Sequence, residues 1–492
     1  MPIILSKSRF VAGGQCLKRL YLQVHQPELA TQSNGADDAI MEQGREVGLL
    51  ARRLFSGGIE VDGSVSLEQA IRITKELLTN PEVPAIFEGA FRDQGLVVKT
   101  DVLQRKGNRW RLVEVKSTTD LKEHHAQDVA VQSYVVSRSG VDLSSVWLAH
   151  VNRDYVLAGD TVDPRQFFLF RNLTGRAQSL QPTVALQLRS QFRALGMPSP
   201  PDVAPGPHCT NPVVCEFFNH CNPPQPEDYI GYLPRLHASA LEQLKEMGVK
   251  SMRDIPADFE LTDFQRRVCT AMQTGQPWYS AELQAEFQSL RYPLLFMDFE
   301  TVNPAIPRFP GMRPYDHLPF QWSLHVQQEP GGTSEHFEFL AEGTSDPRQA
   351  FVSSLCQAVG ESGSIVVYNQ QFESQRLWEL AGWLPEYAER IRAIQRRLWD
   401  LLPVVRSHVY HPAFGGSFSL KAVLPALVPE MSYEGMDVAN GQAAGLAWEA
   451  MISGKSTEAE RQAKRKALLE YCGQDTLALI RLLEALQSCC NT

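Results

Sequence analysis

Acidic residues in the stretch LVVKTDVLQRKGNRWRLVEVKS have spacings that suit metal-dependent phosphate chemistry. Its two alternating apolar segments, separated by Lys-Gly-Asn, are typical of paired strands joined by a turn. Asp101 lies on the first strand, and Glu114 and Lys116 lie two residues apart on the second, so the latter two share a face. Carboxylates held together bind Mg²⁺, which polarises a phosphate and lowers the pKa of bound water. Lys116 would then steady the attacking water or the developing charge.

The next segment, KEHHAQDVAVQSYVVSRSG, is predicted to be a helix with Asp128 and Gln132 on one face. An isolated Glu-x-Lys is common, and on a solvated edge strand it carries no function. The upstream aspartate, the paired strands and the following helix together favour a nuclease-like site.

A second acidic pattern occupies the C-terminal part of the chain. YPLLFMDFETV is predicted to be an apolar strand with Asp298 and Glu300 on one face. The late segment STEAERQAKRKALLEYCGQDTLALIRLLEALQ is predicted to be a long helix on which Tyr471 and Asp475, four apart, share a face. Either pair alone is common. It is uncommon for both pairs to occur in this order with an acidic residue, Glu373 in YNQQFESQRL, at the start of a helix between them.

The first pattern resembles the RecB-like branch of the PD-(D/E)XK nuclease superfamily, in which an Asp, a Glu-x-Lys and a helix with Gln and Tyr form the site. The match is approximate at Gln132 and Tyr134, because the family spaces these two more widely. Where the family often has a metal-binding His, this chain has Gly48, so we consider Glu88 as a substitute. The resemblance implies catalytic roles and Mg²⁺ or Mn²⁺ binding among Asp101, Glu114, Lys116, Gln132 and Glu88.

The second pattern resembles the DnaQ-like DEDDy exonucleases, which have an RNase H-like fold. The resemblance implies that Asp298, Glu300 and Asp475 hold two divalent metals and that Tyr471 orients the attacking water. Glu373 stands where the family has Asp, and it could still ligate with a different reach. Asp400 also has a counterpart in the family, but we interpret it as structural.

Of the nine cysteines, Cys209, Cys215 and Cys221 form a tight group with five residues between neighbours, and Cys16 stands alone near the start of the chain. Thiolates suit zinc or iron–sulfur clusters, and this spacing lacks the C-x2-C of a zinc ribbon. It resembles the staple of RecB-like nucleases, which holds a four-iron, four-sulfur cluster. His208 and His220 keep a mixed Cys/His zinc site as the alternative. We interpret Cys269, Cys356 and Cys472 as small buried hydrophobic residues.

The chain has 492 residues, and its length predicts about three domains. The helices and strands that position these residues are expected to lie in those domains. We expect an α/β protein with a restriction-endonuclease-like domain over 1–225, a helical connector over 226–290, and an RNase H-like mixed-sheet domain over 291–492. The connector segment LKEMGVKSMRDI resembles a helix-hairpin-helix around Gly248, although a plain helical linker fits it as well. SGKST at 453–457 lacks the upstream glycine of a phosphate loop, so we interpret it as the start of the last helix.

The composition limits the function classes. A net charge of −9 argues against a simple basic nucleic-acid coat, but not against a nuclease whose acidic sites bind metal. With neither a long apolar run nor a signal sequence, we expect a soluble, cytoplasmic protein without a membrane partner.

The whole chain resembles uncharacterised bacterial proteins that join an iron–sulfur RecB-like domain to an RNase H-like exonuclease domain. The resemblance implies metal-dependent hydrolysis of nucleic acid, DNA rather than RNA, at both sites, with the C-terminal site working from 3′ to 5′ on single strands. The alternatives are an exonuclease whose N-terminal domain only binds DNA, and a scaffold with inactive sites.

Overall fold

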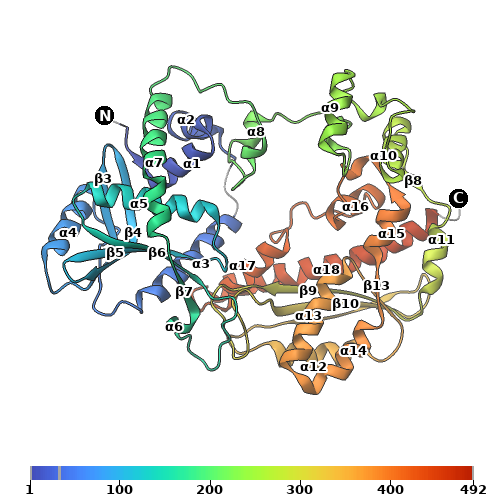
Figure 1. Ribbon diagram of the computed structural model, residues 1–492. Helices are drawn as coiled ribbons and strands as arrows, with labels where there is room; N and C mark the ends of the chain where they lie inside the picture. Colours follow the sequence, from blue (N-terminus) through green and yellow to red (C-terminus); the bar gives the residue numbers. More distant parts are fainter. Residues whose placement is uncertain (1–2, 32–34, 490–492) are drawn as a thin grey trace. The chain divides into compact units, whose positions relative to one another are not determined.

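The computed structural model describes residues 3–31 and 35–489, and the chain divides into two compact units (Figure 1). Unit 1 contains residues 1–224 and 304–316, and unit 2 contains residues 225–303 and 317–492. Both are mixed α/β structures, which confirms the coarse fold class. Across the described ranges, no helix is long and apolar enough to cross a membrane.

Unit 1 is built on a seven-stranded sheet with the order β2-β3-β4-β5-β6-β7, and β1 pairs with β4. The strands are β1 (Leu5–Ser6), β2 (Ile59–Glu60), β3 (Ala85–Asp93), β4 (Leu96–Lys106), β5 (Arg109–Lys116), β6 (Leu143–Val151) and β7 (Phe168–Asn172). The helices are α1 (Lys7–Gln15), α2 (Leu17–His25), α3 (Gly35–Arg52), α4 (Leu67–Thr79), α5 (Glu123–Arg138), α6 (Pro164–Phe167), α7 (Thr174–Leu195) and α8 (Phe218–Cys221). The expected strand pair is present as β4 and β5, and the expected helix as α5.

Two apolar cores cover the two faces of this sheet. Leu112 of β5 and Val129 of α5 belong to one core, whereas Val113 of β5 and Val47 of α3 belong to the other. Side chains alternate along β5, so Glu114 and Lys116 face the same side as Leu112, toward α5. The fold therefore aims both residues at the helix that the sequence predicted.

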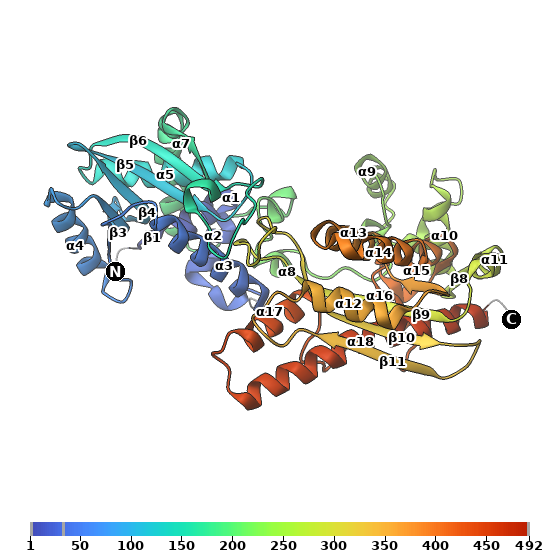
Figure 2. The same cartoon turned by 90° about the horizontal axis from the view of Figure 1, so that it is seen from below.

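Unit 2 contains a five-stranded sheet with the order β11-β10-β9-β12-β13, whose neighbours β11, β10 and β9 lie side by side in Figure 2. Its strands, with those of a small separate pair, are β8 (Trp278–Tyr279), β9 (Leu294–Val302), β10 (Leu318–Gln327), β11 (Ser334–Leu340), β12 (Ser364–Val367), β13 (Leu398–Asp400) and β14 (Val409–Tyr410). Its helices are α9 (Ala238–Glu246), α10 (Asp263–Thr274), α11 (Leu283–Glu286), α12 (Arg348–Val359), α13 (Gln370–Trp383), α14 (Ala388–Gln395), α15 (Leu401–His408), α16 (Leu420–Leu427), α17 (Gly441–Ile452) and α18 (Glu458–Cys489).

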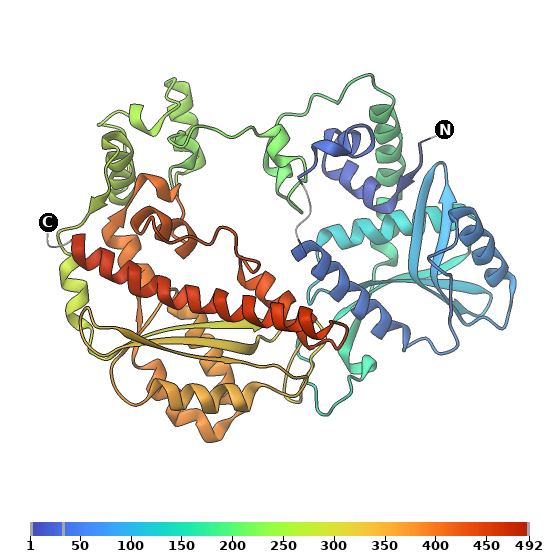
Figure 3. The same cartoon turned by 180° about the vertical axis from the view of Figure 1, so that it is seen from behind.

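The sheet of unit 2 is covered on both faces. Helix α18 lies over one face and α12 and α14 lie over the other, as Figures 1 and 3 show. Leu294 and Phe296 share a core with α18, whereas Leu295, Met297 and Phe299 share a core with α12, α13 and α14. Even-numbered positions of β9 therefore point toward α18.

The segment between residues 226 and 290 packs against the C-terminal elements, since Leu244 and Val268 share a core with Leu294 and Leu479. Only one helix of the expected hairpin is present. Helix α9 ends before Gly248, whose φ is 79°, and the chain then makes a short 3-10 turn at Met252–Asp254. Pro256 follows closely and disfavours helical backbone at the residue before it.

Candidate metal centre

Strand β9 places Asp298 and Glu300 on the face of the sheet that α18 covers. The apolar residues around them belong to both cores, so the strand is held between two layers and both carboxylates lie on the α18 side. Glu300 is buried and Asp298 is half-buried. The two-residue spacing thus yields the shared face that the sequence predicted.

Helix α18 brings Tyr471 and Asp475 to the same place. Its first turn is fixed by Thr457, whose hydroxyl accepts from the Glu460 amide while the Glu460 side chain accepts from the Thr457 amide. This capping box confirms that SGKST precedes a helix start. Leu468, Leu479 and Leu482 are buried, so the apolar face of the helix is held against the sheet.

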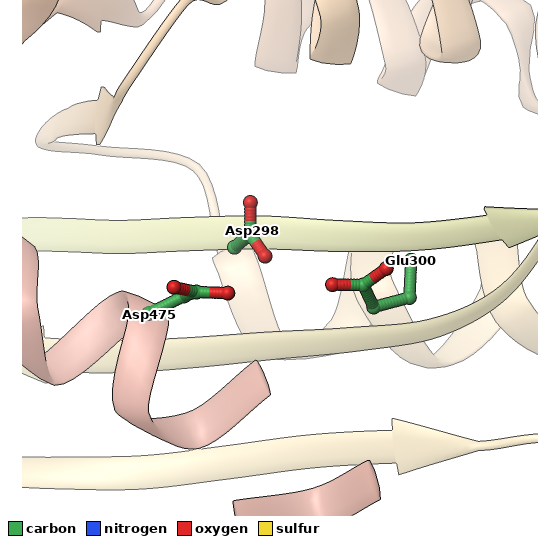
Figure 4. Close-up of side chains that lie close together, drawn as sticks. All are labelled: Asp298, Glu300 and Asp475. Carbon is green, nitrogen blue, oxygen red and sulfur yellow. The ribbon is translucent and has the colours of Figure 1, made fainter. Parts of the chain in front are cut away.

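Asp298, Glu300 and Asp475 form one cluster (Figure 4), in which one oxygen of each carboxylate lies within 4.8 Å of the others. Within residues 3–31 and 35–489, no other set of three histidine, cysteine or carboxylate side chains is this close. Oxygen ligands from several carboxylates are what Mg²⁺ and Mn²⁺ prefer. The donor set therefore fits a divalent cation.

The electrostatics of the cluster reflect an excess of negative charge. Burial, and then repulsion from Asp475, raises the pKa of Asp298 well above its usual range, and burial and Asp298 do the same for Glu300. Burial raises the pKa of Asp475 to about 6, although hydrogen bonds from Tyr433 and Tyr471 and the nearby Lys421 oppose the rise. A bound cation would relieve this repulsion directly.

Glu373 lies in the first turn of α13, outside the group of three. Its side chain is 2% exposed, and its Oε2 atom has no hydrogen-bond partner. Burial, followed by the charge of Asp298, raises its pKa well above the usual range. A buried carboxylate oxygen without a partner is costly unless a cation or water satisfies it, so Glu373 is a candidate fourth ligand.

Tyr433 and Lys421, which the sequence did not single out, and Cys472, to which it assigned no site role, complete the surroundings. The Tyr433 hydroxyl donates to Asp475 Oδ1 at 2.6 Å, and Lys421 Nζ lies 5.3 and 5.2 Å from the ring centres of Tyr433 and Tyr471. The sulfur of Cys472 lies 3.8 Å from Asp298 Oδ2. Cys472 is buried as expected, but our interpretation of it as only a small hydrophobic residue missed this contact.

Asp400 has the structural role that we expected. Its two carboxylate oxygens accept from the amides of Asn369 and Gln370, at 2.9 and 3.0 Å, and from the Leu402 amide at 3.0 Å. It therefore caps α15 and also fixes the start of α13, the helix that carries Glu373.

The predicted N-terminal site differs from the carboxylate cluster of unit 2, because lysine side chains contact its carboxylates directly. Lys7 Nζ and Lys116 Nζ lie 2.8 and 3.0 Å from Glu114 Oε1, and Gln132 donates to Glu114 Oε2. Lys116 also pairs with Asp128 at 2.5 Å. Gln132 and Asp128 thus reach the site from α5 as predicted, whereas Lys7 enters from α1, 107 residues from its partner.

Charge at this site is largely neutralised by the protein. Burial opposes ionisation of Glu114, but Lys7 and Lys116 outweigh it and lower its pKa. Asp101 Oδ2 accepts from the Val115 amide at 2.7 Å, and burial with repulsion from Glu114 raises its pKa to about 7.

The remaining predicted residues of this site lie around it. Glu88 has a φ of 55° and pairs with Arg52 at 3.1 Å, and it does not form a three-ligand group with Asp101 and Glu114 among the described residues. Tyr134 is buried in the core that α5 shares with the sheet. A side chain at Gly48 would meet nothing within 4 Å at its Cβ.

The four predicted cysteines converge. Cys16 lies between α1 and α2, and it lines one small cavity together with Cys209, Cys215 and Cys221. Gln15 donates to the carbonyls of His208 and Val213 at 2.6 and 2.8 Å, which ties the proline-rich loop to the N-terminal helices. His208 lines the same cavity, whereas His220 does not.

Comparison with known proteins leaves the function open. A family model described as a domain of unknown function, DUF2779, matches residues 295–419, which include Asp298, Glu300 and Glu373. The chain is 27% identical over 220 residues to an uncharacterised protein of Mycoplasma pneumoniae, covering 41% of this chain and 33% of that protein. It is 32% identical over 73 residues to an uncharacterised protein of Ureaplasma parvum, covering 15% and 11%. The chain thus spans a third or less of the length of these curated relatives.

Proposed function

We propose that unit 2 is a metal-dependent nuclease of the DEDDy exonuclease type, with an RNase H-like fold, acting on single-stranded nucleic acid in the 3′ to 5′ direction. The observation that carries this proposal is the cluster of Asp298, Glu300 and Asp475, with Tyr471 beside it. The order of the sheet, with β10 antiparallel to β9 and β12 parallel to it, is compatible with such a fold.

Mg²⁺ or Mn²⁺ would be held by Asp298, Glu300, Asp475 and Glu373, and when bound would polarise the phosphate and lower the pKa of water. The residues of the chain prepare that site. Tyr433 and Tyr471 fix the Asp475 carboxylate by hydrogen bonds, and the side chains of Glu300 and Glu373 are buried. Burial and the carboxylates raise the pKa of Tyr471, so it stays a neutral hydroxyl that can orient a water molecule.

Unit 1 supports a RecB-like nuclease proposal less directly. Asp101, Glu114, Lys116 and Gln132 lie together, but both Glu114 oxygens are already bonded to Lys7, Lys116 and Gln132. These contacts count against cleavage by unit 1, as in the alternative in which only the C-terminal domain cuts. Catalysis at this site would require Lys7 to leave Glu114 so that Asp101 and Glu114 could share a metal.

We further propose that Cys16, Cys209, Cys215 and Cys221 hold a four-iron, four-sulfur cluster. Their convergence on one small cavity supports this proposal. His208 Nε2 lies 3.7 Å from Cys209 Sγ, so a mixed Cys/His zinc site is the alternative. Purified anaerobically, the protein should absorb in the visible range and contain iron, and Cys209→Ser should remove both signals. A colourless protein containing zinc would overturn the cluster proposal.

Nuclease activity is tested with end-labelled single- and double-stranded DNA and RNA in Mg²⁺ or Mn²⁺. We expect shortening of single strands from the 3′ end, which Asp298→Asn abolishes and Asp101→Asn leaves in place. If wild-type protein cuts none of these substrates in either metal, the scaffold alternative replaces the nuclease proposal.

A further inference from the structure

A groove of about 900 Å³ lies within unit 2 between the segment before α13 and the helices α10 and α15. Arg235 and Arg267 line it from the 226–290 segment, and Arg406 lines it from α15. Phe264, Tyr368 and Phe418 supply aromatic surface.

The charge of this groove contrasts with that of the chain. Its described lining contains three arginines and neither aspartate nor glutamate, in a protein of net charge −9. Over residues 3–31 and 35–489, none of the three arginines forms an ion pair with a carboxylate. Arg267 donates to the Ser407 carbonyl, whereas Arg235 and Arg406 are exposed. Guanidinium groups without carboxylate partners are suited to bind phosphate.

The aromatic residues lie close to one another and to the arginines. The rings of Phe264 and Phe418 lie 5.8 Å apart, and both are half-buried. The Tyr368 hydroxyl donates to the Phe418 carbonyl at 2.7 Å, which holds the loop before α16 in place. Arg235 and Arg267 lie 5.5 and 5.7 Å from the Phe264 ring centre. Alternating aromatic faces and cations are typical of surfaces that bind unpaired bases along their backbone.

The groove adjoins the carboxylate cluster along the chain. Asn369 lines it four residues before Glu373, and Leu420 lines it directly before Lys421, the cation beside Tyr471. We propose that this groove, formed partly by the 226–290 segment, binds the single-stranded nucleic acid that approaches the cluster. The inference rests on the proposed nuclease function for the link to catalysis, but binding itself can be tested separately.

The test measures fluorescence anisotropy of labelled single-stranded DNA and RNA oligonucleotides in an Asp298→Asn background, which prevents cleavage. We expect the double variant Arg235→Glu/Arg406→Glu to weaken binding roughly tenfold or more. The slope of log affinity against log salt should fall by about 1.4, since each phosphate contact to a single strand contributes about 0.7. The alanine double variant should show a smaller loss of the same kind.

The matched control is Arg266→Glu/Arg392→Glu. Both residues are exposed in unit 2, neither lines the groove, and the net charge changes by the same amount. Equal weakening by the two double variants, no weakening by the groove variant, or no binding by the parent would each overturn the inference. So would equally tight binding of an acidic peptide that competes with the oligonucleotide.

The two proposals fail in different ways. If wild-type protein cuts nothing but binding depends on Arg235 and Arg406, the groove stands and the nuclease proposal falls. If wild-type protein cuts single strands and the groove variant has an unchanged KM, the nuclease proposal stands and the groove inference falls.

Discussion

The two acidic sites of this chain differ in where their compensating charge comes from. In unit 1, Glu114 is bonded to Lys7 and Lys116, and its pKa is lowered. In unit 2, Asp298 and Glu300 have raised pKa values because burial and neighbouring carboxylates outweigh Lys421. Two similar sequence patterns thus produce one site that the protein has neutralised itself and one that is suited to an external cation.

The largest expected effect is on hydrolysis. Asp298→Asn should lower Mg²⁺-dependent cleavage by about 10³-fold or more, because it removes a charged ligand from the proposed metal site. Initial rates on a labelled single strand measure the loss. Glu430→Gln, an exposed carboxylate of the same unit, serves as the control and should be unchanged. Comparable activity in the two variants would show that the cluster is not catalytic.

Glu114→Gln should destabilise unit 1 by about 3 kcal/mol, because it leaves Lys7 and Lys116 without their shared carboxylate. Urea unfolding of wild type and variant measures this difference. The exposed Glu123, which pairs with Arg176, provides a control, and Glu123→Gln should change stability by less than about 0.5 kcal/mol. A stability gain in Glu114→Gln would contradict the idea that this site is internally neutralised.

Mn²⁺ or Mg²⁺ should stabilise unit 2 by about 2.7 kcal/mol at a hundred times its dissociation constant. Thermal unfolding with increasing metal should show the shift, and Asp298→Asn should remove most of it. In EDTA the same variant should be more stable than wild type, since it relieves repulsion. If the metal stabilised wild type and Asp298→Asn equally, the metal would bind at a site other than this cluster.

The smallest effects concern pH. Asp475 has a pKa of about 6 in the folded protein and 3.8 as its ordinary value, so it contributes stability at low pH that is lost as the pH rises through 6. Glu114 has a lowered pKa, so it contributes stability above about pH 4.5, and this contribution is lost as the pH falls. In EDTA, the stabilising effect of Asp475→Asn should therefore grow by roughly 2 kcal/mol from pH 4 to 6.5. The destabilising effect of Glu114→Gln should shrink below pH 4.5. If the stability changes caused by Asp475→Asn and Glu114→Gln varied with pH in the same direction, the two sites would not differ in the way described.

Much of the local structure followed from periodicity. The two-residue spacing of Asp298 and Glu300 and the four-residue spacing of Tyr471 and Asp475 determine which side chains share a face. Helix starts were also predictable, since the capping pattern at Thr457 uses contacts within one turn. By contrast, the second helix expected after Gly248 did not form, because the short segment before Pro256 cannot complete one.

The sequence by itself determined which carboxylates share one face of a strand and which helix carries the tyrosine, whereas the grouping of the four cysteines came from a family resemblance. Only the tertiary structure decided which acidic site is already neutralised. Lys7 reaches Glu114 across 107 residues, and Tyr433 reaches Asp475 across 42. Spacing encodes contacts within a strand or helix turn, whereas these contacts depend on how separate elements pack, and no local pattern records that.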